Sequence, residues 1–264
     1  MFDEDAIATS IQKQPEVKRG PGRPRKVPVD AAGVADDAAG APDEAADNVP
    51  ESALAVMGDP QSIEEALGGP DHKEWMAAMK KEIASLSEKN TWITCDLPAG
   101  KKAIDCKWVF RVKNHTDGTL DKRKARLVAR GFSQRPGIDY GQTFSPVIRY
   151  ESIRILLSIA AHENLEVEAL DVVTAFLNGE VQEELYMKQP PCFDDGTGRV
   201  CRLVKSLYGL KQAPKEWNRK LTAFLKSLGL MQSDTDPCVF MSPYGSKRIL
   251  LGIYVDDGIL CCDS

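Results

Sequence analysis

Two neighbouring aspartates, Asp256 and Asp257, interrupt the apolar run ILLGIYVDDGILCC near the end of the chain. A third, Asp171, stands at the end of the apolar segment LEVEALDV. If the two segments are neighbouring strands of one sheet, their carboxylates lie together and repel one another. A hard divalent cation removes that repulsion and leaves coordination positions for substrate phosphates. The acids therefore predict a site for two Mg²⁺ ions that activates a hydroxyl and stabilises a leaving oxygen.

An ordinary surface turn is the alternative explanation of these residues. Asp-Asp-Gly is a common turn sequence, and Gly258 is expected to permit the tight bend. A single aspartate such as Asp171 at the end of a strand is equally ordinary. The combination of the two motifs, more than either one, favours the metal site.

Three helices that help to position the acids are predicted from apolar residues recurring every three or four positions. They cover residues 71–90, 151–164 and 213–229, with Asp71 as the first N-cap and Pro214 in the last helix's first turn. The stripes expected to face the core are Trp75, Met79, Ile83 and Leu86 in the first helix, Ile153, Leu156, Leu157 and Ala160 in the second, and Trp217, Leu221, Phe224 and Leu228 in the third.

Strands are predicted where apolar and polar residues alternate, with turn residues at the ends. They cover residues 103–113, 120–132, 165–172, 238–242 and 248–255. The first two form a hairpin across HTDG, with a basic face that carries Lys122, Lys124, Arg126 and Arg130. Antiparallel strands with packed helices predict an α+β fold.

The composition limits the remaining possibilities. The formal net charge is −5, yet Lys and Arg concentrate at residues 18–26, 101–135 and 202–226, which favours an anionic partner. Residues 1–69 are expected to be disordered because their long Ala- and Asp-rich stretch buries too little apolar surface. Seven cysteines without a signal peptide favour free thiols inside the cell. No apolar run predicts a membrane span.

A basic segment, VKRGPGRPRK at residues 17–26, allows three interpretations. It resembles an AT-hook, in which Arg19, Arg23 and Arg25 would enter the minor groove of A·T-rich DNA. A nuclear localisation signal and a plain basic linker are the alternatives.

The chain resembles the reverse transcriptases of Ty1/copia-type retrotransposons. YVDD at residues 254–257 is similar to the Tyr-x-Asp-Asp box of these polymerases. Longer blocks follow in the family's order: NTWITCDLPAGKKAIDCKWVFRVK (90–113), KARLVARGFSQRPGIDYGQTFSPVIRYESIRILLSIAA (124–161), LDVVTAFLNGEVQEELYMKQP (170–190), LVKSLYGLKQAPKEWNRKL (203–221) and ILLGIYVDD (249–257). The resemblance implies a right-hand polymerase with fingers and palm over residues 70–264.

The resemblance also implies roles for individual residues. Asp171, Asp256 and Asp257 would be catalytic and would bind the metal ions together with the carbonyl of Val172. Attack of a primer 3′-hydroxyl on the α-phosphate of a dNTP is the expected reaction. Phe176 would exclude the ribose 2′-hydroxyl, and Thr174 and Ala175 would offer backbone N–H groups to the triphosphate. Phe176 as an ordinary core residue is the alternative.

Further nucleotide-binding residues are expected in two other blocks. In SLYGLKQAPKEW, Gly209 would allow close backbone approach, and Lys211 and Gln212 would contact template or nucleotide. In the basic hairpin, Lys124 and Arg126 project to the same face and would hold the triphosphate. Generic surface charge is the alternative for Lys124, Arg126 and Lys211.

The expected partners are a primer–template and dNTPs, along with integrase and RNase H as other parts of a Pol polyprotein. The chain ends shortly after YVDD, where family members continue with a thumb. An inactive retrotransposon-derived fragment that at most binds nucleic acid therefore stays open as a second interpretation. A chromatin protein built around residues 17–26 is a third.

Overall fold

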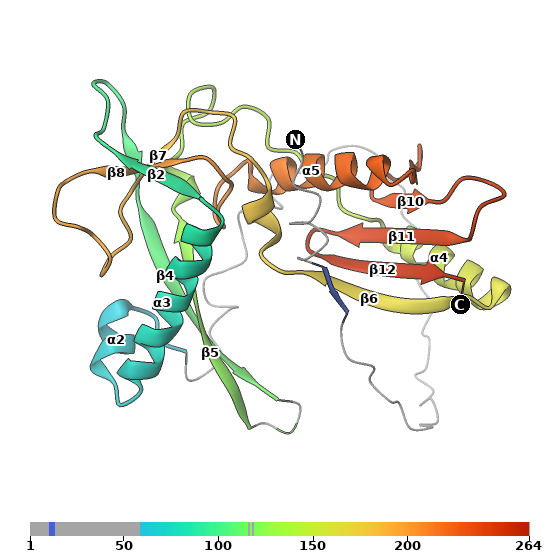
Figure 1. Ribbon diagram of the computed structural model, residues 1–264, viewed down its shortest axis with the longest axis horizontal. Helices are drawn as coiled ribbons and strands as arrows, with labels where there is room; N and C mark the ends of the chain where they lie inside the picture. The colour runs from blue at the N-terminus through green and yellow to red at the C-terminus, as the bar shows by residue number, and fades with distance from the viewer. Residues whose placement is uncertain (1–10, 14–58, 116, 118, 264) are drawn as a thin grey trace, which may run out of the picture. The chain divides into compact units, whose positions relative to one another are not determined.

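The computed structural model describes residues 11–13, 59–115, 117 and 119–263 (Figure 1). Its described elements combine α-helices with mainly antiparallel sheets, so the predicted mixed α+β class is confirmed. Ordered structure begins before the predicted start near Pro70, because Ile11–Lys13 forms strand β1 and Ile63–Gly68 forms helix α2. The remaining residues of the 1–69 segment up to Gly58, with Arg19, Arg23 and Arg25, lie outside the described residues.

Helix α3, His72–Glu88, buries the predicted stripe of Trp75, Met79 and Leu86. The predicted capping role of Asp71 is wrong, because its side chain makes no capping hydrogen bond. Its backbone is not extended as capping requires, and its carboxylate forms an ion pair of 2.6 Å with the Arg123 guanidinium instead. Asp71 thus ties α3 to the neighbouring hairpin.

That hairpin consists of β4, Cys106–Asn114, and β5, Leu120–Ala129, as the sequence predicts. One face of β4 is buried at Cys106, Trp108 and Phe110. The predicted strand 103–113 is divided, however: Ala103–Ile104 forms a separate strand, β3, in another sheet. Arg130 lies just after the end of β5, where it precedes the short 3₁₀ helix η2, Gly131–Ser133.

The sheet that contains β3 was not predicted as a unit. Its order is β2-β8-β7-β3, with β2 at Trp92–Cys95, β7 at Tyr186–Lys188 and β8 at Val200–Leu203. β3 and β7 run parallel, so the sheets are not purely antiparallel. Strands this short carry too little alternation for a period of two to stand out in the sequence.

The largest sheet has the order β1-β6-β12-β11-β10-β9 (Figure 1). Its further strands are β6, Glu166–Val172; β9, Met231–Gln232; β10, Val239–Met241; β11, Ile249–Tyr254; and β12, Asp257–Cys262. Helix α4, Tyr150–Glu163, covers one face, where Leu250 joins Leu156 in a buried cluster. Helix α5, Ala213–Ser227, covers the other, where Leu251 packs with Trp217.

Two predicted core positions in these helices are wrong. Leu157 is 42% exposed and Leu228 is 60% exposed, whereas Leu156 and Leu225 are buried. Leu157 is turned about 100° from Leu156 around the helix axis, toward solvent. Leu228 lies at the C-cap of α5, past the last residue that can continue its buried face. In the described part of the chain no helix is long and apolar enough to cross a membrane.

Candidate active site

Strands β6 and β12 place two of the predicted acids directly opposite each other. Asp171 is the pairing partner of Asp257, and the Val172 N–H donates to the carbonyl of Asp256 at 2.8 Å. Because hydrogen-bonded and non-hydrogen-bonded pairs alternate in an antiparallel ladder, Asp171 and Asp257 form the non-hydrogen-bonded kind, about 4.5 Å apart at Cα. Asp256 precedes Asp257 in the turn between β11 and β12. The structure thus brings all three aspartates to one end of the sheet.

The strand arrangement differs from the predicted one in a specific way. β6 and β11 are not neighbours, because β12 lies between them (Figure 1). Gly258 is not the residue that permits the bend, since it lies within β12. A Cβ at Gly258 would lie 3.3 Å from Ile253 Cδ1 and 3.4 Å from Leu170 Cβ, so glycine lets neighbouring side chains pack closely there.

The bend itself falls at Val255, which has a left-handed backbone with φ of 56°. This conformation is unfavourable for a β-branched residue and must be held by its surroundings. The Val255 carbonyl accepts a hydrogen bond of 2.7 Å from the indole Nε1 of Trp217, which is buried in α5. The sequence shows Trp217 only as a core residue; its contact with the acidic turn comes from the fold.

The electrostatics of the acids fit a cation site. Burial raises the pKa of Asp257, and the negative charges of Asp256 and Asp171 raise it further. Within the described residues, no three acidic, His or Cys side chains are gathered closely enough to hold a metal ion by themselves. Mg²⁺ commonly takes one or two carboxylates and completes its shell with water and substrate phosphates. The carboxylates are therefore of the kind that fits Mg²⁺, with other oxygen ligands completing its shell.

The residues that follow Asp171 form a tight turn beside the acids. Val172 is buried, and Thr174 has a left-handed backbone with φ of 56°. The 3₁₀ helix η3, Ala175–Asn178, starts there, with Ala175 buried and Phe176 partly exposed. The Thr174 hydroxyl donates to the carbonyl of Val173 at 2.7 Å. The predicted positions Thr174, Ala175 and Phe176 thus lie next to the acid pair along the chain.

Tyr208 links this turn to the basic hairpin. Its ring meets the Phe176 ring edge-on, with centroids 4.9 Å apart. The guanidinium of Arg126 lies over the Tyr208 ring, 4.9 Å from its centroid. Tyr208 was not among the predicted site residues, although it lies within the block SLYGLKQAPKEW that carries the resemblance.

The basic residues of the hairpin are crowded and partly buried. Burial lowers the pKa of Lys124, and the charge of Arg126 acts in the same direction. Glu82 of α3 partly compensates them and accepts a hydrogen bond from the Leu127 N–H at 3.3 Å. Burial raises the pKa of Glu82, while Arg126 and Lys124 oppose that rise. Glu82 is a second residue of this region that sequence reasoning missed.

The backbone at Gly209 lies close to a neighbour, as predicted, but that neighbour is strand β5 of the same chain. A Cβ there would lie 2.1 Å from the Ala129 carbonyl oxygen, and φ is 88°. Gln212, expected to contact template or nucleotide, is instead fully buried. Its side-chain oxygen accepts a hydrogen bond from Gln134 at 3.0 Å, and its side-chain nitrogen donates to Glu183 at 3.1 Å. Lys211 donates its backbone N–H to Gln134 at 2.9 Å, and its side chain is half-buried.

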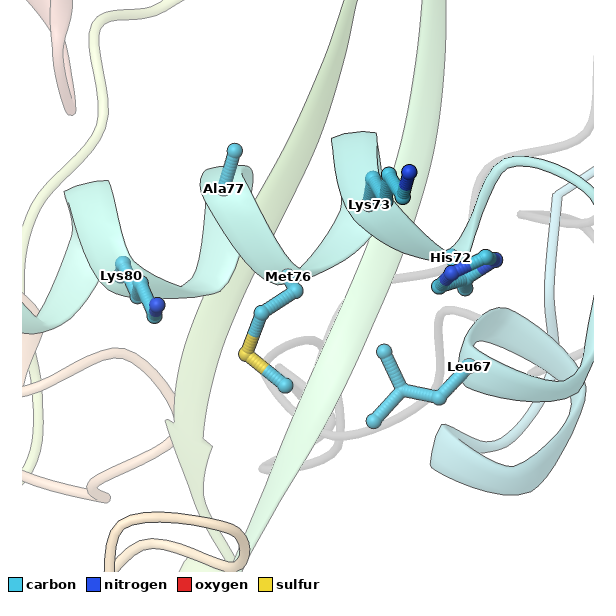
Figure 2. A pocket seen from close by; sticks show the side chains of 6 residues that line it. All are labelled: Leu67, His72, Lys73, Met76, Ala77 and Lys80. Carbon is cyan, nitrogen blue, oxygen red and sulfur yellow. The ribbon is translucent and has the colours of Figure 1, made fainter.

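A separate hollow lies between α2 and α3 and has a volume of about 400 Å³. Leu67 and Met76 extend into the space between the two helices (Figure 2). His72, Lys73 and Lys80 also line the hollow. None of the three aspartates lines it. The hollow is therefore distinct from the candidate active site.

Comparison with known proteins identifies the family. Residues 89–264 match the family described as reverse transcriptase (RNA-dependent DNA polymerase). The chain is 45% identical over 205 residues to the "Retrovirus-related Pol polyprotein from transposon TNT 1-94" of Nicotiana tabacum, covering 76% of this chain and 15% of that protein. It is 40% identical over 209 residues to the "Retrovirus-related Pol polyprotein from transposon RE2" of Arabidopsis thaliana. That match covers 78% of this chain and 14% of the Arabidopsis protein.

A more distant relative is the "Transposon Ty1-DR5 Gag-Pol polyprotein" of Saccharomyces cerevisiae, which is 33% identical over 195 residues. That match covers 72% of this chain and 11% of the yeast protein, so the chain spans only a small part of each of these relatives. The chain therefore belongs to the reverse transcriptase (RNA-dependent DNA polymerase) family, and within it to the copia-type retrotransposon Pol proteins.

Proposed function

We propose that this chain carries out RNA-directed DNA polymerisation, joining a dNTP to a primer 3′-hydroxyl with release of pyrophosphate. The observation that supports it most is the pairing of Asp171 with Asp257, beside Asp256 in the adjoining turn. When bound, two Mg²⁺ ions, or Mn²⁺ in their place, would lower the pKa of the primer 3′-hydroxyl and neutralise charge on the phosphates. The three carboxylates and the Val172 carbonyl are the proposed ligands.

In this proposal the residues around the acids orient the substrates. Arg126 and Lys124 form charge-assisted hydrogen bonds to the triphosphate. Phe176 lies against the sugar and rejects a 2′-hydroxyl, while the backbone at Thr174 and Ala175 faces the phosphates. Lys211 remains a proposed template or nucleotide contact, and Gly209 contributes indirectly by letting its loop press against β5.

In this proposal the elements of the fold correspond to parts of a right-hand polymerase. The six-stranded sheet with α4 and α5 would form the palm, and the β4–β5 hairpin with α3 would form the fingers, within residues 70–264. A primer–template is the proposed partner, along with integrase and RNase H parts of a complete Pol polyprotein. The match of residues 89–264 to the polymerase family supports this assignment.

Primer extension tests the proposal. The parent chain, an Asp256→Asn variant and an Asp234→Asn control are each given primer–template, dNTPs and Mg²⁺ or Mn²⁺. Asp234 is an exposed acid outside the site, so its variant controls for the general effect of losing a carboxylate. We expect Asp256→Asn to reduce extension more than about a hundredfold, because even outer-shell partners of metal ligands contribute ten- to hundredfold.

The alternative, an inactive chain that binds nucleic acid, gives a different result. Such a chain binds primer–template with an affinity that falls steeply as salt rises, yet extends no primer in either metal. Equal extension by the parent chain and by Asp256→Asn would contradict the proposed catalytic site.

A further inference from the structure

Tyr208 lies between two parts of the proposed site. The face of its ring carries the Arg126 guanidinium, and its ring meets Phe176 edge-on, both at 4.9 Å between centres. Arg126 comes from the β4–β5 hairpin, and Phe176 comes from the turn after β6. One aromatic ring therefore contacts both the proposed triphosphate-binding residue and the proposed sugar-selecting residue.

We propose that Tyr208 is a positioning residue whose ring fixes Arg126 and Phe176 relative to each other, so that triphosphate binding and exclusion of ribonucleotides depend on one another. This inference rests on the proposed function. It assigns to Tyr208 no contact with the reacting atoms. The ring acts only through the two side chains that it holds.

The backbone around Tyr208 is well suited to hold the ring still. The Tyr208 carbonyl accepts a hydrogen bond of 2.8 Å from the N–H of Ala129 in β5. Gly209 lets the loop approach this closely, because a Cβ there would lie 2.1 Å from the Ala129 carbonyl oxygen and 2.7 Å from Val128 Cγ1. Tyr208 is thus anchored on the same strand that carries Arg126.

Phe176 is anchored independently. It lies within η3, and its carbonyl accepts a hydrogen bond from the Gly179 N–H at 3.0 Å. A Cβ at Gly179 would lie 3.0 Å from the backbone nitrogen of Trp217, so this turn packs directly on α5. The Tyr208 ring therefore bridges two separately fixed segments.

The charges around Tyr208 act on its hydroxyl group. Burial raises the pKa of Tyr208, Arg126 opposes the rise, and Asp256 and Asp171 add to it. The phenol is therefore neutral at physiological pH. The contacts with Arg126 and Phe176 involve the aromatic ring and not the hydroxyl, so substitution can separate the role of the ring from that of the hydroxyl.

Nucleotide binding without chemistry tests the inference. The full chain is assembled on a primer–template in Ca²⁺, and the dissociation constants of a dNTP and the matching rNTP are measured by competition with a fluorescent dNTP. Tyr208→Leu removes the ring and keeps an apolar side chain. Tyr208→Phe is the matched control that removes only the hydroxyl.

We expect Tyr208→Leu to weaken dNTP binding about tenfold and to reduce the preference for dNTP over rNTP by a similar factor, since two ring contacts are lost. Tyr208→Phe should stay within about twofold of the parent chain in both quantities, since the phenyl ring retains both contacts. Arg126→Ala should lower affinity for both nucleotides, and Phe176→Ala should lower the preference.

Two results would overturn the inference: unchanged preference in Tyr208→Leu, or an equal loss in Tyr208→Phe. If Tyr208→Leu does not fold, as thermal melting will show, a double-mutant cycle between Arg126→Ala and Phe176→Ala decides the question. Coupled effects support the inference and additive effects contradict it. A parent chain that binds neither nucleotide would instead contradict the proposed function, and the inference with it.

Discussion

Asp171 and Asp257 stand opposite each other as a cross-strand pair between β6 and β12, with like charges on the same face of the sheet. Such pairs destabilise a sheet unless something neutralises them. Burial and the two neighbouring carboxylates raise the pKa of Asp257 accordingly. We expect this arrangement to cost stability in the absence of a cation, as the proposed metal site requires.

Asp257→Asn should stabilise the chain at neutral pH by about 0.2–1 kcal/mol, since the cross-strand repulsion is removed. An acid whose pKa is raised by folding destabilises the folded state above that pKa. The penalty disappears as the pH falls below the unfolded value of about 3.9. Urea unfolding at pH 7 and at pH 3.5 should therefore show a gain only at pH 7. An Asn variant that is less stable at pH 7 would contradict this explanation.

Mg²⁺ should stabilise the parent chain by about 1–3 kcal/mol at concentrations well above its dissociation constant, because only the folded state brings the acids together. Asp171→Asn should remove most of this gain. The measurement is a thermal melt over a range of Mg²⁺ and Mn²⁺ concentrations. Asp234→Asn, at an exposed site away from the acids, should retain the gain. An identical response in both variants would exclude Asp171 as a ligand.

Trp217→Phe should destabilise the chain by about 1–3 kcal/mol and weaken its response to Mg²⁺. The phenyl ring fills most of the buried space, but the Val255 carbonyl loses its 2.7 Å donor. Trp108→Phe is a matched control, because the Trp108 indole donates to the Pro191 carbonyl at 3.1 Å in a different part of the fold. The control should lose comparable stability and keep the full Mg²⁺ response. Equal Mg²⁺ responses would show that Trp217 has a purely structural role.

Gly252→Ala should destabilise the chain by about 1–3 kcal/mol through overpacking. A Cβ at Gly252 would lie 2.6 Å from Ile148 Cδ1 and 2.8 Å from Leu156 Cδ1, between β11 and α4. Gly141→Ala is the control, since a Cβ at Gly141 meets no atom within 4 Å. Chemical denaturation of both variants checks the prediction. If both substitutions have the same effect, the packing of α4 on the sheet is not as close as described.

The fold shows where sequence patterns are reliable. The stripe of Trp75 and Met79 in α3 and the alternation of Trp108 and Phe110 in β4 were predictable, because each depends only on the period of one element. Leu157 and Leu228 were not, since the partner of a helix chooses the face that is buried and the end of the helix limits how far that face extends. The burial of Gln212 was not predictable for a related reason: its partners Gln134 and Glu183 are distant in sequence.

By itself, the sequence determined the three aspartates, the family to which their flanking blocks belong, and the helix and strand periods around them. Only the tertiary structure decided that β12 separates β6 from β11, that Asp171 therefore faces Asp257, and that Trp217 and Tyr208 contact the site. The physical reason is that periodicity is a property of a few successive residues. The choice of strand neighbour depends on the total packing of segments far apart along the chain.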